Sequence, residues 1–324
     1  MKSDFLKTHS KEVKTIAGLL GLYAVARCSL RALLALSKVS WFQKSLIDRY
    51  GANSWAVVTG SSEGLGKGYC EELASRGFNI VFISRSKQKL QQVQEEFQKK
   101  FPAIKTKAIS ADFTKSFQPG FFEDIKKELQ GLDISVLVNN VGLSHDEAFS
   151  QSSVPDLLKV LTVNLVPMVM LSKLLISDML KRNHRSLIIN ISSLTMFVGC
   201  ERLAVYGGTK RFIDFFSRSL SLMAPNKVEV ISHRCGVVST PATGFTEPGK
   251  LLCLSARDCA RGVIREVGRN KDWTFGHLHH KIGGTFMRIA PKKMMSKTMD
   301  EEANKTIERR KTFTGAPKLD SNPQ

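Results

Sequence analysis

Short apolar runs alternate with longer amphipathic stretches from Ser54 to about Gly276. Six runs of about five to seven residues have the composition of buried strands: WAVVT (55–59), NIVFIS (79–84), IKTKAIS (104–110), ISVLVNN (134–140), SLIINIS (186–192) and KVEVIS (227–232). Amphipathic stretches such as Ser86–Phe101 and Val205–Met223 lie between them. This alternation predicts an α/β domain in which helices cover both faces of a parallel sheet.

The two ends of the chain differ from this middle part, and three segments are expected: 1–50, 51–280 and 281–324. The uncharged apolar run Thr15–Ala26 has 12 residues, fewer than the roughly 18–20 that span a bilayer as a helix. Arg27 and Arg31 follow it, and we favour a membrane anchor at 15–37, spanning or lying in the interface, over a soluble amphipathic helix. Beyond Lys281 we expect one amphipathic helix around 285–310 and a loose tail.

The net charge of +19 suits an anionic membrane surface or a phosphate-bearing small molecule. Nothing in the chain resembles a nucleic-acid-binding motif, so no nucleic-acid partner is expected. The six cysteines form no CxxC pair and are interpreted as thiols in a reducing compartment. His277, His279 and His280 have no carboxylate or cysteine at ligand spacing, so we predict no metal site.

A glycine-rich run, TGSSEGLG, follows the first predicted strand and opens a helix. Glycines there let the backbone turn sharply and approach a pyrophosphate, as in a Rossmann-type doubly wound sheet. The second strand ends in Arg85 and Lys87, with no acid until Glu95, which favours the 2′-phosphate of NADP(H) over NAD. The predicted phosphate-binding residues are Gly60, Ser61, Ser62, Gly64, Leu65, Gly66 and Arg85.

A second group of side chains suits proton transfer. Tyr206 and Lys210 are four apart at the start of a predicted helix and therefore share a face. A lysine cation beside a phenol stabilises the phenolate, so the phenol can protonate a carbonyl oxygen as hydride arrives. Ser193 ends a predicted strand, where its hydroxyl could hold the substrate oxygen.

Together these residues resemble the short-chain dehydrogenase/reductase family over about residues 54–245. NNVG (139–142) is similar to the family's N-N-A-G, and the Ser193–Tyr206 spacing of 13 residues (206 − 193) is also the family's. The resemblance implies further cofactor contacts and a fourth catalytic residue. It also implies that Tyr206 and Lys210 contact the cofactor. The cofactor contacts are Asp112, Asn139, Val238 and Thr240, and the fourth catalytic residue is Asn164.

Within the family, the chain is more similar to one branch than to the others. That branch comprises the very-long-chain 3-oxoacyl-CoA reductases and the type 3 and type 12 17β-hydroxysteroid dehydrogenases. This implies an NADPH-dependent enzyme of the endoplasmic reticulum membrane, its domain facing the cytosol, that reduces 3-oxoacyl-CoA in fatty-acid elongation. A hydroxysteroid dehydrogenase, another lipid ketoreductase and a non-catalytic NADP(H)-binding scaffold remain alternatives. FIDFF (212–216) is expected at a core and homodimer face. The family's Y-S-A-S-K is YGGTK here, and Cys235 replaces an expected proline.

Overall fold

The structure is a computed structural model that describes residues 45–145, 147–245 and 253–312, and positions 15, 18, 19, 21–23, 25–27 and 29. The chain divides into two compact units, and the second begins at Leu46. Helix α3 (Leu46–Tyr50) opens this unit, and fully buried Tyr50 donates a hydrogen bond to Glu229 (2.7 Å). The folded unit therefore starts five residues before the boundary predicted at Gly51.

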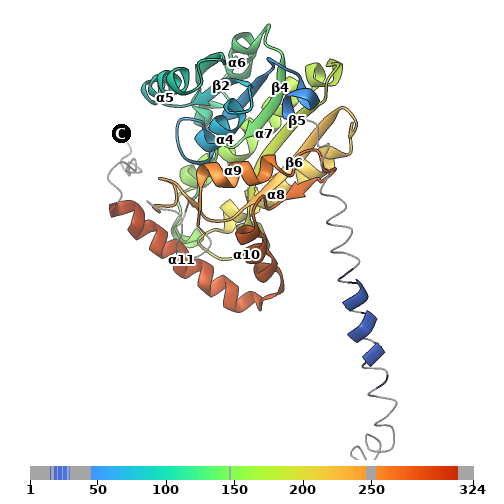
Figure 1. The fold of residues 1–324 in the computed structure, drawn as a ribbon. Helices are drawn as coiled ribbons and strands as arrows, with labels where there is room; N and C mark the ends of the chain where they lie inside the picture. Colours follow the sequence, from blue (N-terminus) through green and yellow to red (C-terminus); the bar gives the residue numbers. More distant parts are fainter. Residues whose placement is uncertain are drawn as a thin grey trace, which may run out of the picture. The chain divides into compact units, whose positions relative to one another are not determined.

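Seven strands in the described part of the chain form one parallel sheet with the order β3-β2-β1-β4-β5-β6-β9 (Figure 1). The order reverses between β1 and β4, which opens a crevice at the carboxyl ends of these strands. This confirms the predicted Rossmann-type doubly wound sheet. The strands are β1 (Trp55–Thr59), β2 (Asn79–Ser84), β3 (Thr106–Ser110), β4 (Ile134–Asn139), β5 (Ser186–Ser193), β6 (Val228–Cys235) and β9 (Trp273–Thr274), and a separate pair is formed by β7 (Val238–Ser239) and β8 (Leu254–Ser255).

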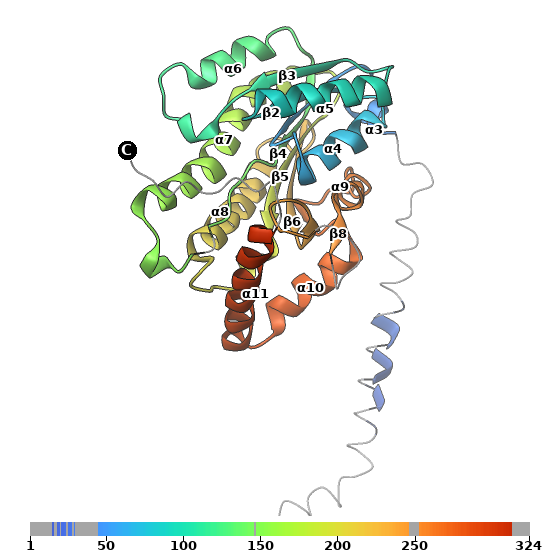
Figure 2. The ribbon, with the colours of Figure 1, turned by 90° about the vertical axis from the view of Figure 1, so that its left-hand side faces the viewer.

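Helices cover both faces of the sheet, and each face has its own apolar core (Figure 2). Helices α4, α5 and α9 pack on one face, while α6 and α7 pack on the other and α8 lies against β5 and β6. Their bounds are α4 (Gly64–Ala74), α5 (Lys87–Lys100), α6 (Phe121–Leu129), α7 (Val154–Lys181), α8 (Ala204–Ser221) and α9 (Ala256–Ile264), with short 3-10 turns η1 (Phe113–Lys115), η2 (Phe149–Gln151) and η3 (Leu194–Phe197).

Strand β6 extends three residues beyond the predicted apolar run. The extension contains polar His233 and Arg234, both almost completely buried. Buried polar groups are tolerated where they find partners, and both residues do: Tyr69 hydrogen bonds to His233, and Asp214 pairs with Arg234. The strand is therefore held by side-chain pairing that a hydrophobic pattern does not reveal.

Two helices, rather than the single one expected around 285–310, follow the sheet. They are α10 (Leu278–Ile289) and α11 (Lys292–Thr312), and Pro291 separates them. A proline lacks the N–H that a continuous helix needs, which explains the break. Both helices lie beyond the carboxyl ends of the strands (Figures 1 and 2).

The predicted anchor at 15–37 lies mostly outside the described residues. The described positions between 15 and 29 are helical, and their large apolar side chains are exposed: Leu19, Leu22, Tyr23 and Val25. Within the described residues only α7 is long and apolar enough to span a membrane. Half of the most apolar part of α7 is buried, and the helix packs against β4, β5 and α8.

An ion pair is buried between α8 and the end of β6. Arg234 donates two hydrogen bonds to Asp214 (2.8 and 3.0 Å), and Ser232 donates a third (2.7 Å). The Arg234 guanidinium also stacks on Trp273, 3.9 Å from the ring centroid. Both charged side chains are buried, and each is the other's ion-pair partner. Loss of one charge would therefore leave the other buried and unpaired.

We therefore expect Asp214→Asn to lower the free energy of unfolding by about 3–5 kcal/mol, measured by urea denaturation. The double variant Asp214→Leu, Arg234→Met removes both charges and should lose less than the single variant. A single-variant loss below about 1 kcal/mol would show that the pair does not stabilise this corner of the sheet.

Candidate active site

The glycine-rich turn joins β1 to α4 and packs too closely for larger residues. Gly60 and Gly64 have left-handed φ angles of 63° and 58°. A Cβ on Gly66 would lie 2.2 Å from the Gly60 carbonyl oxygen. Glu63 at the N-cap of α4 bonds to Lys89 (2.7 Å) instead of capping the helix. The N-terminal amides of α4 are therefore suited to an anionic group.

The remaining turn residues fix its position. The Ser61 side chain is buried and donates to the Ile83 carbonyl (3.4 Å), and Ser62 bonds to Ser84 at the end of β2 (2.9 Å). Leu65 packs against the apolar core beneath α4. These contacts connect the predicted phosphate-binding turn to the start of the segment that carries Arg85.

Two adjacent asparagines, Asn139 at the end of β4 and Asn140 directly after it, bond to different parts of the structure. The amide of Asn139, predicted to contact the cofactor, is buried and donates to Asn190 (2.8 Å) and Ser172 (3.2 Å). The Asn140 amide, which sequence reasoning did not single out, donates to the carbonyls of Thr59 (2.9 Å) and Gly60 (3.2 Å). Asn139 thus connects strands, while Asn140 shapes the glycine turn.

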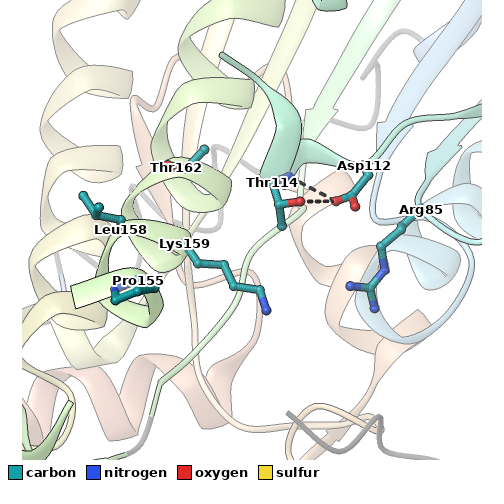
Figure 3. A pocket seen from close by; sticks show the side chains of 7 residues that line it. All are labelled: Arg85, Asp112, Thr114, Pro155, Leu158, Lys159 and Thr162. Atoms are coloured by element: carbon teal, nitrogen blue, oxygen red, sulfur yellow. Dashed lines mark hydrogen bonds between the residues drawn. The ribbon is translucent and has the colours of Figure 1, made fainter. Parts of the chain in front are cut away.

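A pocket of about 500 Å³ lies beside the end of β2 (Figure 3). The side chains of Arg85, which follows β2, and Lys159, in α7, line it from opposite sides. Asp112 accepts hydrogen bonds from the backbone amide (3.1 Å) and hydroxyl (2.9 Å) of Thr114. The pocket is lined by Arg85, Asp112, Thr114, Pro155, Leu158, Lys159 and Thr162. Two cations at one opening suit a phosphate group, and Lys159 was not predicted.

The predicted catalytic residues come from neighbouring elements. Ser193 ends β5, and its hydroxyl accepts from the Thr195 amide (3.2 Å). Tyr206 lies in the first turn of α8, and a Cβ on the next residue, Gly207, would lie 3.3 Å from the Thr195 carbonyl oxygen. This close approach places the start of α8 beside the segment that follows Ser193.

Asn164 and Lys210 meet at one point from α7 and α8. Buried Asn164 accepts from the Leu143 amide (2.7 Å) and donates to the Leu143 carbonyl (2.9 Å). A Cβ on Gly142 would lie 3.3 Å from the Asn164 carbonyl oxygen and 3.4 Å from the Lys210 amine. A side chain at position 142 would therefore be in tight contact with both side chains.

Burial determines the acid–base state of Lys210. Its amine donates to the Ile191 carbonyl (2.9 Å) and lies 5.4 Å from the Tyr206 ring centroid. Burial lowers the Lys210 pKa from 10.5 to about 8. At neutral pH the amine still keeps its proton, which places a cation beside the Tyr206 ring.

The segment after β6 closes over the glycine turn. Val238 is buried, and its carbonyl accepts from the Thr243 hydroxyl (2.6 Å). A Cβ on Gly64 would lie 3.2 Å from the Thr240 side chain. Thr240 thus reaches the N-terminus of α4, next to the predicted phosphate-binding turn.

Helix α11 forms a wall next to Tyr206 that sequence reasoning missed. Ala303 and Met299 cluster with Cys200, Leu203 and Tyr206. The signal is present in the sequence, because Met295, Met299 and Ala303 recur every four residues. An otherwise strongly charged helix conceals this narrow apolar stripe.

Known proteins agree with this architecture. The sequence model of the short chain dehydrogenase family matches residues 54–250. Very-long-chain 3-oxoacyl-CoA reductase of Mus musculus is 36% identical over 248 residues, which cover 75% of this chain and 77% of that protein. The Homo sapiens protein of the same name is 41% identical over 246 residues, which cover 74% and 77%.

Solved structures share the fold. A short-chain dehydrogenase from Sphingobium yanoikuyae in complex with NADPH superposes with a TM-score of 0.64 at 23% identity, covering 75% of this chain and 95% of its own. A 7beta-hydroxysteroid dehydrogenase gives 0.68 at 22% identity, covering 79% and 99%. This chain belongs to the short-chain dehydrogenase family and is an oxidoreductase that uses a nicotinamide dinucleotide.

We expect Tyr206→Phe to abolish turnover and leave dinucleotide binding nearly unchanged, because only the hydroxyl is lost. Steady-state rates and fluorescence titration with the dinucleotide test the two parts separately. More than about a tenth of wild-type activity would show that another group donates the proton.

Proposed function

We propose that this enzyme reduces long-chain 3-oxoacyl-CoA to 3-hydroxyacyl-CoA with NADPH, as in fatty-acid elongation. The observation that carries the proposal is the set Asn164, Ser193, Tyr206 and Lys210 in a chain that shares three quarters of its length with 3-oxoacyl-CoA reductases. The bound dinucleotide supplies hydride to the carbonyl carbon.

The chain's own residues would then handle the carbonyl oxygen. The Ser193 hydroxyl orients it by a hydrogen bond, and the Tyr206 hydroxyl gives it a proton as the alcohol forms. The buried Lys210 cation stabilises the resulting phenolate until a proton returns from solvent. Asn164 positions the Leu143 backbone and α8 through its bonds to Leu143 and Thr209 (3.1 Å to the hydroxyl).

The preference for NADPH is supported by the charges around the pocket in Figure 3. Exposed Arg85 and half-buried Lys159 both line it. A 2′-phosphate placed there would receive charge-assisted hydrogen bonds from both, whereas the ribose hydroxyl of NADH would leave two cations facing each other.

Arg85→Asp should therefore narrow the preference for NADPH over NADH at least about tenfold, since one such contact contributes about 1.5–3 kcal/mol. Lys159→Ala should also narrow the preference for NADPH over NADH, by a smaller factor. Lys99→Asp, at the other end of α5, makes the same charge change as a control. An unchanged ratio of kcat/KM values in Arg85→Asp would show that another residue binds the phosphate.

Delivery of a long acyl chain from a membrane is supported by α10. Its exposed apolar residues recur at helical spacing, and exposed cations flank them on α10 and α11. An apolar stripe bordered by basic residues is typical of a helix at an anionic membrane interface. We propose that this stripe and the N-terminal segment hold the domain on the cytosolic side of the endoplasmic reticulum membrane. The stripe is Leu278, Ile282, Phe286 and Ile289, and the cations are Lys281, Arg288, Lys292 and Lys293.

A homodimer is supported by the outer surface of α8. Phe212 and Phe216 stack at 9° between ring planes, and Phe215 remains 71% exposed. Large exposed aromatic side chains are enriched at protein interfaces. We propose that the FIDFF segment lies at the contact between two copies.

Substrate choice can be tested by following NADPH oxidation with 3-oxoacyl-CoA thioesters of several lengths and with 17-ketosteroids. We expect kcat/KM to be at least about tenfold higher for long acyl thioesters, which is about 1.4 kcal/mol of transition-state preference. Added salt should raise KM for the CoA thioesters more than for steroids, because it screens the cations that attract CoA phosphates.

The same acyl chain on a thioester without the nucleotide part of CoA provides the matched control. Equal kcat/KM for the two thioesters would show that CoA phosphates are not recognised. Faster turnover of a ketosteroid would instead favour a hydroxysteroid dehydrogenase, and no turnover of any substrate would favour a cofactor-binding scaffold.

A further inference from the structure

Four potential metal ligands from three elements converge outside the catalytic group. His233 and Cys235 end β6, Cys259 lies in α9, and His280 lies in the first turn of α10. All four are buried, with His233 and Cys259 fully so. One ligand atom from each lies within 4.8 Å of all the others. The elements are far apart in the sequence, so no local motif announces the cluster.

The distances suit a tetrahedral ion bound by two sulfurs and two nitrogens. The Cys235 and Cys259 sulfurs are 3.7 Å apart, and the Cys259 sulfur is 3.7 Å from His233 Nε2 and 3.9 Å from His280 Nδ1. Zinc–sulfur bonds of about 2.3 Å and zinc–nitrogen bonds of about 2.0–2.1 Å place neighbouring tetrahedral ligands about 3.3–3.8 Å apart. The pairs that are farther apart, up to 4.8 Å, would have to close by about 1 Å when the ion binds.

The outer ring nitrogens are held in the manner of metal-bound histidines. His280 Nε2 lies 3.1 Å from the Val237 carbonyl oxygen, which can only accept, so this nitrogen carries the proton. The inner Nδ1 of His280 therefore presents a lone pair to the cluster. His233 Nδ1 lies 2.9 Å from the Tyr69 hydroxyl oxygen. If Nδ1 carries the proton and donates this hydrogen bond, Nε2 is left as the ligand. Such outer partners fix tautomer and ring orientation in metal sites.

The backbone is also adapted to the cluster. A Cβ on Gly236 would lie 2.4 Å from the His280 ring, so glycine is needed for the ring to enter. Cys235 stands where the family resemblance leads us to expect proline. Cys235 is therefore a ligand that the family pattern does not predict.

A disulfide between Cys235 and Cys259 would involve only two of the four side chains in the cluster. It requires the two sulfurs to close from 3.7 Å to about 2.05 Å and leaves two oriented imidazole lone pairs without a partner. A divalent ion uses all four ligands, and two thiolates balance its charge inside a closed site. Tetrahedral coordination by two sulfurs and two nitrogens favours zinc.

We propose that His233, Cys235, Cys259 and His280 form a structural Zn²⁺ site. The ion connects the end of β6 to α9 and α10. It thereby fixes the start of the segment that carries Val238 and Thr240 over the glycine turn. With four protein ligands and no open position, its role is to position this segment rather than to contact substrate. The site does not depend on which carbonyl substrate the enzyme uses.

The metal content of the full-length protein, purified in detergent without added chelator, tests this directly. We expect about one zinc ion per chain in the wild type. Cys259→Ala should reduce the content at least about tenfold, whereas Cys70→Ala, which removes an equally buried thiol in α4, should leave it unchanged. Zinc retained by Cys259→Ala would overturn the assignment.

Cobalt exchange keeps the test independent of whether Cys259→Ala folds. Wild-type protein stripped of zinc and refilled with Co²⁺ should show the visible bands of tetrahedral thiolate-bound cobalt, while dinucleotide binding reports a folded domain. If the purified wild type contained no zinc and the refilled protein showed no cobalt spectrum, the proposal would be overturned. A Cys235–Cys259 disulfide, found by mass spectrometry of the unreduced wild type, would also overturn it.

Discussion

The close backbone approach of Gly60 to Gly66 is the constraint on which the rest of the site depends. Because a Cβ on Gly66 would lie 2.2 Å from the Gly60 carbonyl oxygen, no larger residue can bring α4 this near to the end of β1. Asn140 then joins this turn to β4 through the Thr59 and Gly60 carbonyls, across the position where the strand order reverses. The crevice at that position is consequently framed by rigid backbone, and the segments that carry Arg85 and Thr240 are placed relative to it.

The predicted catalytic residues depend on a second contact, between α7 and α8. Asn164 bonds to Leu143 and Thr209, and Gly142 allows the Lys210 amine to come near it. This packing buries Lys210 and lowers its pKa to about 8. A buried cation beside Tyr206 is thus a result of how two core helices meet, so the chemistry and the stability of this region cannot be altered separately.

Sequence reasoning predicted most of the sheet, because parallel strands buried on both faces leave continuous apolar runs. It missed the last three residues of β6, because His233 and Arg234 are buried only through partners distant in the chain. It overlooked Asn140, because its amide bonds to the carbonyls of Thr59 and Gly60, which are about 80 residues earlier in the chain. The convergence of His233, Cys235, Cys259 and His280 depends on three separate elements, so spacing along the chain carried no signal for it.

The position of α11 beside Tyr206 has a consequence for how the enzyme is made and how it changes. This helix is the last described element to leave the ribosome, after the sheet, the glycine turn and both core helices are complete. A nascent chain can therefore form its dinucleotide-binding half before α11 packs beside Tyr206. For the same reason, replacement of the residues on one stripe of α11 can change the surroundings of Tyr206 during evolution without disturbing the sheet.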